Sequence, residues 1–573
     1  MESVDLVIIG AGVFGLAMAR TYAAANPNAK IVVLESASSL GGTWASHRLY
    51  PGLKTNNILG TYEWPDYPMN PMDFEVTPYN HIPGTSLHDY LVRSADHFDI
   101  ARLIRFNTEV QVIEKGSQDD WVLTVKNDSR PSPEQIKAKK LVLAVGLTGN
   151  RNMPDLPGAE AFGNPIFHAK DFLQHESLLK TSKSVVVYGG AKSAYDAVYA
   201  YNTAGIHVDW VIRESGRGPC WMVSPFVTPV HAWLEKLVYM RLLTWLVPCL
   251  WARDGFEAIR NFIHATFIGQ WIVRAFFGVL TKDILGAARF DEHPETAKLK
   301  PWSDLFWAGT SVSILNYPTD FYDNVRQGKV HIHHADITHL SPGRVHLSTG
   351  DSIEAEALHC STGWKHEAPV KLSPPSLAVE LGLPYTAAVE DAALEKRAEK
   401  AELEVVERFP MLKEQPNLHP KRKSKPNINP DATPATTPYR LYNFIVPPKY
   451  IAKRNFAVAG CLLSLGQTVS AEIQAIWITA LFDGNNLALP NSEEEAETST
   501  DRLVAYQRLR HPAGCGSKHG DMIFENLPYW DTLLQDLDLP HMRKGSWAEE
   551  FMTPYSVSDY KGLIQQFLDK RSK

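Results

Sequence analysis

Two stretches of the chain share one pattern of apolar and polar positions. Each begins with a short apolar run that ends in glycine, "DLVIIG" at Asp5–Gly10 and "SVVVYGG" at Ser184–Gly190. Continuous apolar runs of this length are typical of parallel strands buried on both faces. In each copy, small residues then open a helical segment and a second apolar strand follows. The pattern predicts two strand–helix–strand units, about 180 residues apart, in an α/β fold.

The first unit carries the residues of a dinucleotide-binding turn. Gly10, Gly12 and Gly15 follow the strand with the spacing Gly-x-Gly-x-x-Gly, and a helix is predicted over 16–25. This spacing allows a tight turn, lets the backbone approach a pyrophosphate and directs free N–H groups at the phosphates. The next strand ends on Glu35, an acid that accepts both ribose hydroxyls and repels a 2′-phosphate. The first unit is therefore predicted to bind a dinucleotide that lacks a 2′-phosphate.

The segment after Glu35 carries a resemblance to a known family. Gly41-Gly42-Thr43-Trp44, Tyr50-Pro51-Gly52 and Thr55-Asn56 occur in this order, which resembles the flavin-containing monooxygenases and their Baeyer–Villiger relatives. The resemblance implies that the first dinucleotide is FAD and that its site includes Gly42, Trp44 and Thr55. The alternative for Trp44 is a core aromatic packed under a glycine turn.

The second unit differs from the first in one charge. Its turn contains Gly189, Gly190, Lys192 and Ser193, which we expect to surround a cofactor phosphate, with Ala191 at the family's middle glycine. Its partner strand ends on Arg213 instead of an acid, and a guanidinium can hold a 2′-phosphate by forked hydrogen bonds. The second cofactor is therefore predicted to be NADPH, with Arg217 as a further phosphate ligand. The alternative for Arg213 is a solvated charge at a strand end.

Two further positions come from the resemblance. The family carries Phe-x-Gly-x-x-x-His-x-x-x-aromatic between its two turns, and the chain matches it at His168 but has Asn164 in place of the glycine. His168 is either a linker residue that helps to couple the two domains or a satisfied surface histidine. Gly460 lies in a turn between a late strand and an apolar helix. In the family, the N-terminus of that helix points at the flavin, where its dipole favours the anionic reduced ring.

The resemblance extends over about four-fifths of the chain and implies its domain organisation. The fold class is α/β, with two Rossmann-like domains, the NADPH domain inserted into a discontinuous FAD domain, and a helical insertion. We expect the first part of the FAD domain at 1–175 and the NADPH domain at 176–365. The second part of the FAD domain is expected at 366–573, with an exposed loop at 414–438 and a C-terminal extension.

The insertion at 225–290 is apolar, aromatic-rich and helical in period. Its longest apolar run has about the length of a membrane span, but His264 and Arg274 interrupt it, so a true span is not expected. One interpretation is a set of helices packed on the NADPH domain that forms part of a substrate tunnel. The other is peripheral contact with a membrane surface.

Charge and cysteine usage narrow the class of protein. The net charge of −7 over 573 residues gives no basic face, which argues against a nucleic-acid partner. The five cysteines are scattered and include no C-x-x-C pair, which argues against a flavin disulfide reductase and suits a reducing compartment. The first strand begins four residues from the start and leaves no room for a signal peptide. We expect a cytoplasmic protein without a metal site, with membrane association and the oligomeric state left open.

Two nucleotide sites indicate an oxidoreductase. In the resembling family, NADPH reduces FAD and O₂ adds to the flavin C4a, and the resulting peroxide oxidises a small molecule. Baeyer–Villiger enzymes tend to carry Asp at the position of Asn56, where it would position an Arg for the peroxide anion that attacks ketones. The neutral amide of Asn56, the predicted catalytic residue, suits a hydroperoxide that oxidises nitrogen or sulfur.

The predicted activity is therefore an NADPH- and FAD-dependent monooxygenase that consumes O₂. We expect N- or S-oxidation, or hydroxylation, of a bulky small-molecule substrate. Baeyer–Villiger oxidation of a ketone is the first alternative, and an NADPH oxidase that releases H₂O₂ is the second. A redox sensor without catalysis is a third.

Overall fold

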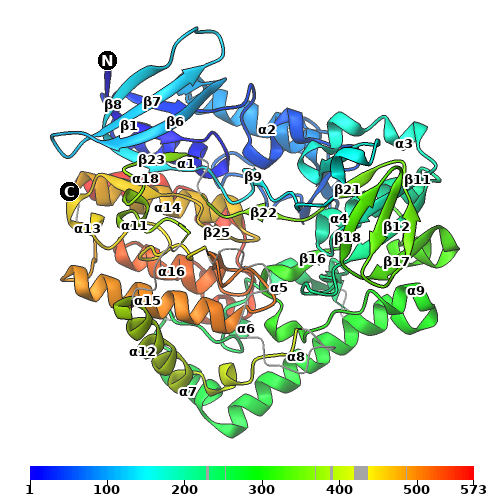
Figure 1. Cartoon of the computed structure of the whole chain (residues 1–573). Coiled ribbons are helices and arrows are strands. Elements are labelled where there is room, and N and C mark those ends of the chain that lie inside the picture. The colour runs from blue at the N-terminus through cyan, green and yellow to red at the C-terminus, as the bar shows by residue number, and fades with distance from the viewer. Residues whose placement is uncertain are drawn as a thin grey trace.

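Two sheets with mainly parallel strands organise the chain in the computed structural model (Figure 1). The structure describes residues 1–227, 232–251, 253–367, 370–386, 392–418, 436–484 and 487–572. Most of the predicted exposed loop at 414–438 lies outside the described residues, since 419–435 are not among them.

The first sheet is built around β1 (Glu2–Ile9), a strand that ends in four buried apolar residues, Leu6–Ile9. β1 pairs in parallel with β2 (Ile31–Leu34) on one side and with β8 (Glu134–Leu143) on the other. β2 also pairs with β5 (Ile104–Arg105) at one edge of the sheet. On the other side of β8, the sheet continues through strands that pair in antiparallel orientation. The remaining strands of this sheet are β6 (Thr108–Lys115), β7 (Trp121–Asn127), β23 (Lys371–Ser373) and β24 (Phe456–Val458).

The second sheet has five strands, and all of its pairings are parallel. Their order across the sheet is β10 (Ile166–His168), β21 (Leu358–Cys360), β11 (Ser184–Tyr188), β12 (His207–Ile212) and β17 (Val330–His334). An antiparallel sheet follows β17 in the chain and consists of β18 (Ile337–Ser341), β19 (Arg344–Leu347) and β20 (Ser352–Glu354).

The order of the strands confirms the predicted fold class. Strands of the first sheet come from both sides of the second sheet in the sequence, because β23 and β24 follow β21 and join β6 and β8. The second domain is therefore inserted into a discontinuous first domain. The two connections between the sheets pair with each other as β9 (Asn150–Arg151) and β22 (Trp364–Lys365). The exact domain boundaries stay a prediction.

Both predicted strand–helix–strand units are present. Helix α1 (Val13–Ala25) joins β1 to β2, and α4 (Lys192–Thr203) joins β11 to β12. Helix α1 begins three residues earlier than the predicted range of 16–25, because Gly12 has extended backbone angles and serves as its N-cap. The helix therefore begins inside the glycine turn, which brings its first N–H groups close to the turn.

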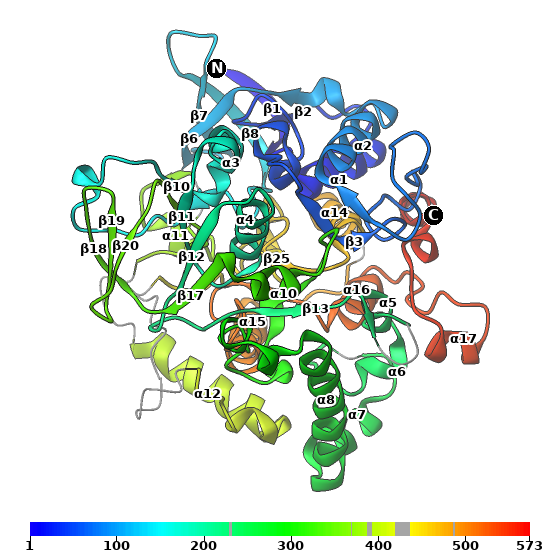
Figure 2. The ribbon, with the colours of Figure 1, turned by 90° about the vertical axis from the view of Figure 1, so that its right-hand side faces the viewer.

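The insertion is mainly helical and projects from the rest of the chain at the lower end of both views (Figure 1, Figure 2). Its helices are α5 (Leu234–Leu237), α6 (Arg241–Thr244), α7 (Glu257–Ala265) and α8 (Phe267–Ala288). Among the described residues, no single helix has the length and composition to cross a membrane. In the described part of the chain, α7 and the segment 267–292 together have the length and apolar composition of a span, but they are bent by 83° relative to each other.

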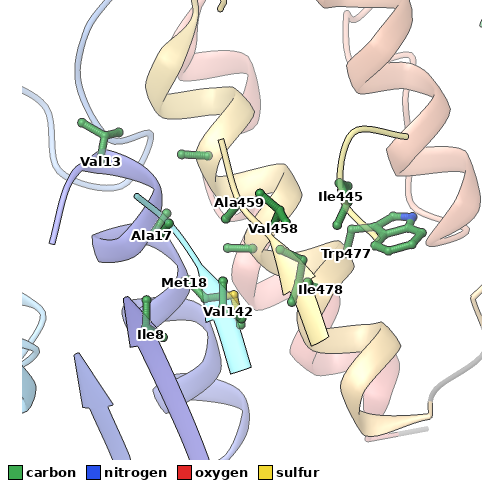
Figure 3. Close-up of a cluster of buried hydrophobic side chains, with 14 of the residues drawn as sticks. Ile8, Val13, Ala17, Met18, Val142, Ile445, Val458, Ala459, Trp477 and Ile478 are labelled. Carbon is green, nitrogen blue, oxygen red and sulfur yellow. The ribbon is translucent and has the colours of Figure 1, made fainter. Parts of the chain in front are cut away.

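The helix α14 (Gln467–Asp483) forms the centre of the largest core. Its residues from Thr468 to Phe482 are all buried, and a helix that is buried on every side must be covered by several neighbours. These neighbours are α1, α16 (Asn526–Asp536) and α18 (Leu563–Arg571). Figure 3 shows Trp477 and Ile478 on α14 near Val458, with Ala17 and Met18 on the neighbouring α1. The outer helices α12 (Ala392–Arg408) and α15 (Glu493–Arg510) pack on each other.

We expect Trp477→Ala to destabilise the protein by about 3–5 kcal/mol, because it leaves a cavity in this core. The Trp477 side chain is fully buried, and its Nε1 donates a hydrogen bond of 3.2 Å to Asp536 Oδ2, which would also lose a partner. The shift of the urea unfolding midpoint measures the effect. Trp547→Ala is the control, since Trp547 is 68% exposed. Equal losses in both variants would contradict this account of the core.

Candidate functional site

The first glycine turn has the geometry of a phosphate-binding site. Gly10 has a φ of 105°, a backbone conformation that favours glycine. The segments at Gly12 and Gly42 pass close to each other, since a Cβ on Gly42 would lie only 3.2 Å from the Gly12 Cα. No described side chain caps the start of α1 at Gly12, so the N–H groups of its first turn face a place where a phosphate fits. Gly15 packs against Gly10, where a Cβ would overlap the Gly10 carbonyl.

Glu35 lies beside this turn, directly after β2. Its carboxylate accepts hydrogen bonds from the Ala11 N–H at 2.8 Å and the Ala37 N–H at 2.9 Å. Trp44 is half-buried, and its Nε1 donates to the Tyr62 hydroxyl at 3.1 Å. The glycine turn, the uncapped helix and the adjacent acid together fit an adenine dinucleotide without a 2′-phosphate. The contacts of Glu35 and Trp44 with the cofactor stay predictions.

The second turn repeats this geometry. Gly189 has a φ of 143°, and α4 begins after Ala191 with no described side chain as its cap. Arg213 follows the end of β12, the place that Glu35 occupies after β2. An uncapped helix start with a cation beside it fits a dinucleotide with a 2′-phosphate.

Two of the predicted phosphate ligands have protein partners in this structure. Lys192 Nζ contacts Asp196 and donates to Asn316 Oδ1 at 2.8 Å and to the Tyr317 hydroxyl at 3.1 Å. Arg217 donates to the carbonyl of Gly514. These contacts tie the second turn to distant parts of the chain, and the roles of both residues toward NADPH stay predictions, as do those of Gly190 and Ser193.

His168 lies at the junction of the two domains. It is buried, so the alternative of a surface histidine is wrong, because β10 places the ring against the returning connection. Its Nδ1 accepts from the Lys170 N–H at 3.1 Å, and its Nε2 is 2.9 Å from the Gly363 carbonyl. Burial lowers the pKa of His168, which favours the neutral ring that these partners require. This position fits the predicted coupling role.

Asn56 lies on β3 (Lys54–Ile58) and lines a large, mostly apolar cavity. Its Nδ2 donates to Ser313 Oγ at 3.2 Å. Its neighbour Thr55 is buried, and the Thr55 hydroxyl donates to the Asn57 carbonyl and accepts from the Ile82 N–H. Thr55 therefore holds the strand that carries Asn56, and its predicted contact with FAD remains untested.

The centre of a water-sized sphere can occupy about 180 Å³ of this cavity, and the wider hollow of about 1390 Å³ includes open solvent. Its walls are mostly apolar and come from the insertion, from 305–314 and from residues near the C-terminal end. The described lining residues include no Lys, Arg or His. The polar lining residues are Asn56, Ser224, Glu235, Thr244, Asp283 and Ser313.

Glu235 is a residue that the sequence interpretation missed. It lies in the first turn of α5 and is only 6% exposed. Its carboxylate contacts Asn57 Nδ2, and that amide also donates to the Leu465 carbonyl at 3.0 Å. Leu465 directly precedes the N-cap Gly466 of α14. Three segments distant in sequence therefore meet beside the cavity. An acid in the apolar run "HAWLEKLVYM" is the only local signal that could have indicated it.

Comparison with known proteins supports the interpretation of the two glycine turns as nucleotide-binding sites. A family model described as pyridine nucleotide-disulphide oxidoreductase matches residues 7–236. Because all five cysteines are free, the shared feature is the nucleotide-binding fold and not a redox disulfide. The FAD-dependent monooxygenase resA of Aspergillus sclerotiorum is 32% identical over 98% of this chain and 98% of its own length. The FAD-dependent monooxygenase DEP4 of Alternaria brassicicola is 30% identical over 100% and 96%.

Solved structures show the same fold. The closed crystal structure of cyclohexanone monooxygenase is 18% identical, covers 93% of this chain and 97% of its own, and has a TM-score of 0.58. S-allyl-L-cysteine S-oxygenase from Allium sativum is 15% identical, covers 99% and 93%, and has a TM-score of 0.53.

Fold, nucleotide turns and relatives together define a flavin-dependent oxygenating enzyme. The chain belongs to the class B flavin monooxygenase family. It is an FAD-dependent monooxygenase, as the sequence predicted, and its use of NADPH stays a proposal.

We expect the stability of Glu235→Gln relative to the unmodified protein to rise with pH. Burial, opposed by hydrogen bonds from Thr61 and Asn57, raises the pKa of Glu235 to about 7. The folded protein thus keeps a proton that the unfolded chain releases, and the unmodified protein loses up to about 3 kcal/mol as the pH rises from about 4.5 to 7.

Thermal unfolding of both proteins between pH 5 and 8 measures this difference. Glu109→Gln is the control, because Glu109 is exposed on β6. If the difference between Glu235→Gln and the unmodified protein did not change with pH, Glu235 would not hold this proton.

Proposed function

We propose that this enzyme uses FAD, NADPH and O₂ to oxidise a nitrogen or sulfur atom of a bulky, apolar small molecule, or to hydroxylate it. The substrate occupies the cavity between Asn56 and the insertion. The size of the cavity and its apolar walls support a substrate of this kind.

The absence of a cation among the described lining residues is the observation that carries the choice of reaction. Ketone oxidation needs an anionic oxygen nucleophile, and a nearby guanidinium or ammonium group would stabilise that charge. Among the described residues of the wall, the polar groups are amide, hydroxyl and carboxyl. A neutral oxygen donor that reacts with an amine or a thioether requires no cation. This composition favours heteroatom oxidation over Baeyer–Villiger oxidation.

Asn56 and Glu235 have different roles in this proposal. FAD, when bound, accepts hydride from NADPH and supplies the chemistry that activates O₂. Asn56 offers a neutral hydrogen-bond donor at the cavity wall and is itself oriented by Ser313. Glu235 is placed to hold a proton on its carboxyl at neutral pH. The apolar walls exclude water from the reacting groups.

A matched set of substrates tests the reaction class. We expect a bulky thioether or tertiary amine to increase NADPH consumption and to give the sulfoxide or the N-oxide. The ketone of the same shape should give no ester. Mass spectrometry of the products identifies the reaction. Ester formation from the ketone without heteroatom oxidation would favour the Baeyer–Villiger alternative, and H₂O₂ as the only product in every case would favour an oxidase.

We expect Asn56→Ala to raise the fraction of NADPH electrons that appear as H₂O₂ severalfold, because the cavity loses a hydrogen-bond donor at the reaction site. FAD content and the rate of flavin reduction by NADPH should stay within about twofold of the unmodified enzyme. Ser224→Ala, at another polar position of the same wall, is the control. An unchanged H₂O₂ fraction in Asn56→Ala would remove Asn56 from the oxygen reaction.

We expect Arg213→Ala to raise the KM for NADPH by about tenfold or more, because a charge-assisted contact with the 2′-phosphate is lost. The KM for NADH, which has no 2′-phosphate, should change little. Arg213→Lys keeps the positive charge but loses the paired hydrogen bonds of the guanidinium. Its KM for NADPH should lie between those of the unmodified enzyme and Arg213→Ala. Steady-state kinetics with both nucleotides measure the ratio. Equal effects on NADPH and NADH would show that Arg213 does not read the 2′-phosphate.

A further inference from the structure

The corner formed by α7 and α8 exposes large apolar side chains. Phe267 is 81% exposed, Trp271 63% and Ile268 61%, and Phe262 on α7 is 49% exposed. They lie on both sides of the bend between the two helices. Contiguous apolar surface of this kind is uncommon on soluble proteins unless it contacts another surface.

The exposed side chains form one continuous face of α8. Phe267 and Trp271 are one helical turn apart, and Val279, two turns further along, is 69% exposed. The opposite face of α8 is also apolar, because Phe276, Phe277 and Leu280 line the cavity beside Asn56. Large apolar side chains on both faces of a helix normally lie against other apolar groups. Those on the outer face of α8 are exposed in this structure.

The shape of this corner favours a lipid surface as those surroundings. In both views the bend between α7 and α8 lies at the lower extremity of the molecule (Figure 1, Figure 2). A projecting corner with aromatic side chains can enter the boundary between lipid headgroups and acyl chains without a complementary cleft on a partner. Trp271 has the ring type that is enriched at this boundary.

The segment that forms the corner carries basic side chains and no acidic ones, and Glu414 contacts it from outside the segment. The sequence between Glu257 and Asp283 contains no Asp or Glu, while it contains Arg260, Arg274 and Lys282. Arg260 is buried, whereas Arg274 and Lys282 are exposed, with Arg274 paired at 2.7 Å to Glu414. Long basic side chains can keep their charges among the headgroups while an apolar face enters the lipid.

We propose that the corner of α7 and α8 docks into the surface of an anionic lipid membrane and lies in the interface without spanning it. Since the inner face of α8 lines the cavity, docking brings the cavity wall next to the lipid. An apolar substrate dissolved in the membrane would then have a short path to Asn56. This last step rests on the proposed function, whereas docking itself does not.

Flotation of the FAD-loaded full chain with vesicles tests docking without any turnover. Vesicles of phosphatidylcholine with about a third phosphatidylserine serve as the anionic probe, and pure phosphatidylcholine as the neutral one. The double variant Phe267→Ser/Trp271→Ser should lose about tenfold or more in vesicle partition. Met72→Ser/Tyr79→Ser is the matched control, because these side chains are 85% and 76% exposed elsewhere on the chain. It should bind as the unmodified protein does.

Two further measurements keep the result interpretable. Arg274→Gln/Lys282→Gln should reduce the preference for anionic vesicles but keep the partition into neutral ones. Equal thermal unfolding of all variants shows that the fold is intact. Failure of the unmodified protein to float, or equal flotation of the Phe267→Ser/Trp271→Ser variant, would overturn the proposal. If the unmodified protein did not bind vesicles but formed a dimer in solution, and Phe267→Ser/Trp271→Ser were a monomer, a second copy of the chain would cover the corner.

Discussion

The burial of α14 from Thr468 to Phe482 determines how the other elements of the first domain are arranged. This helix packs on α1 of the first nucleotide turn and on α16 and α18 from the C-terminal end, so the two halves of the discontinuous domain share one core. Buried polar groups fix its rotation, since Gln474 accepts from the Gly460 N–H and donates to the Tyr529 hydroxyl. Its N-terminus is thereby held against the Asn57 side chain, through the Leu465 carbonyl. The position of the cavity wall follows from the packing of a core helix.

The features that the sequence predicted correctly are those with a local pattern. Each nucleotide turn needs only a strand, closely spaced small residues and a helix, all within about 30 residues. The charge that we expect to distinguish the two cofactors also lies within its own unit, with Glu35 after β2 and Arg213 after β12, and its role stays a prediction. The insertion of one domain into another was predictable only through family resemblance, because β8 and β24 pair across more than 300 residues of sequence.

The cavity wall was not predictable in the same way. Asn57 and Glu235 are 178 residues apart and Asn57 and Leu465 are 408 apart, and no periodicity links such positions. Likewise, the contact of Arg217 with the Gly514 carbonyl depends on how the C-terminal part folds back. The insertion can both form a cavity wall and contact a membrane surface, because α8 presents one apolar face to the cavity and another to the outside. Helical period alone does not separate a helix with two such faces from a core helix.

We propose that the substrate is oxidised in the cavity between Asn56 and α8. The most direct test fills that cavity with Leu280→Trp, on the wall formed by α8, and measures how NADPH electrons divide between oxidised thioether and H₂O₂. We expect product formation to fall by about tenfold or more while FAD content and NADPH oxidation persist and H₂O₂ rises. Unchanged product formation in this variant would contradict the account, because the substrate would then have to react elsewhere.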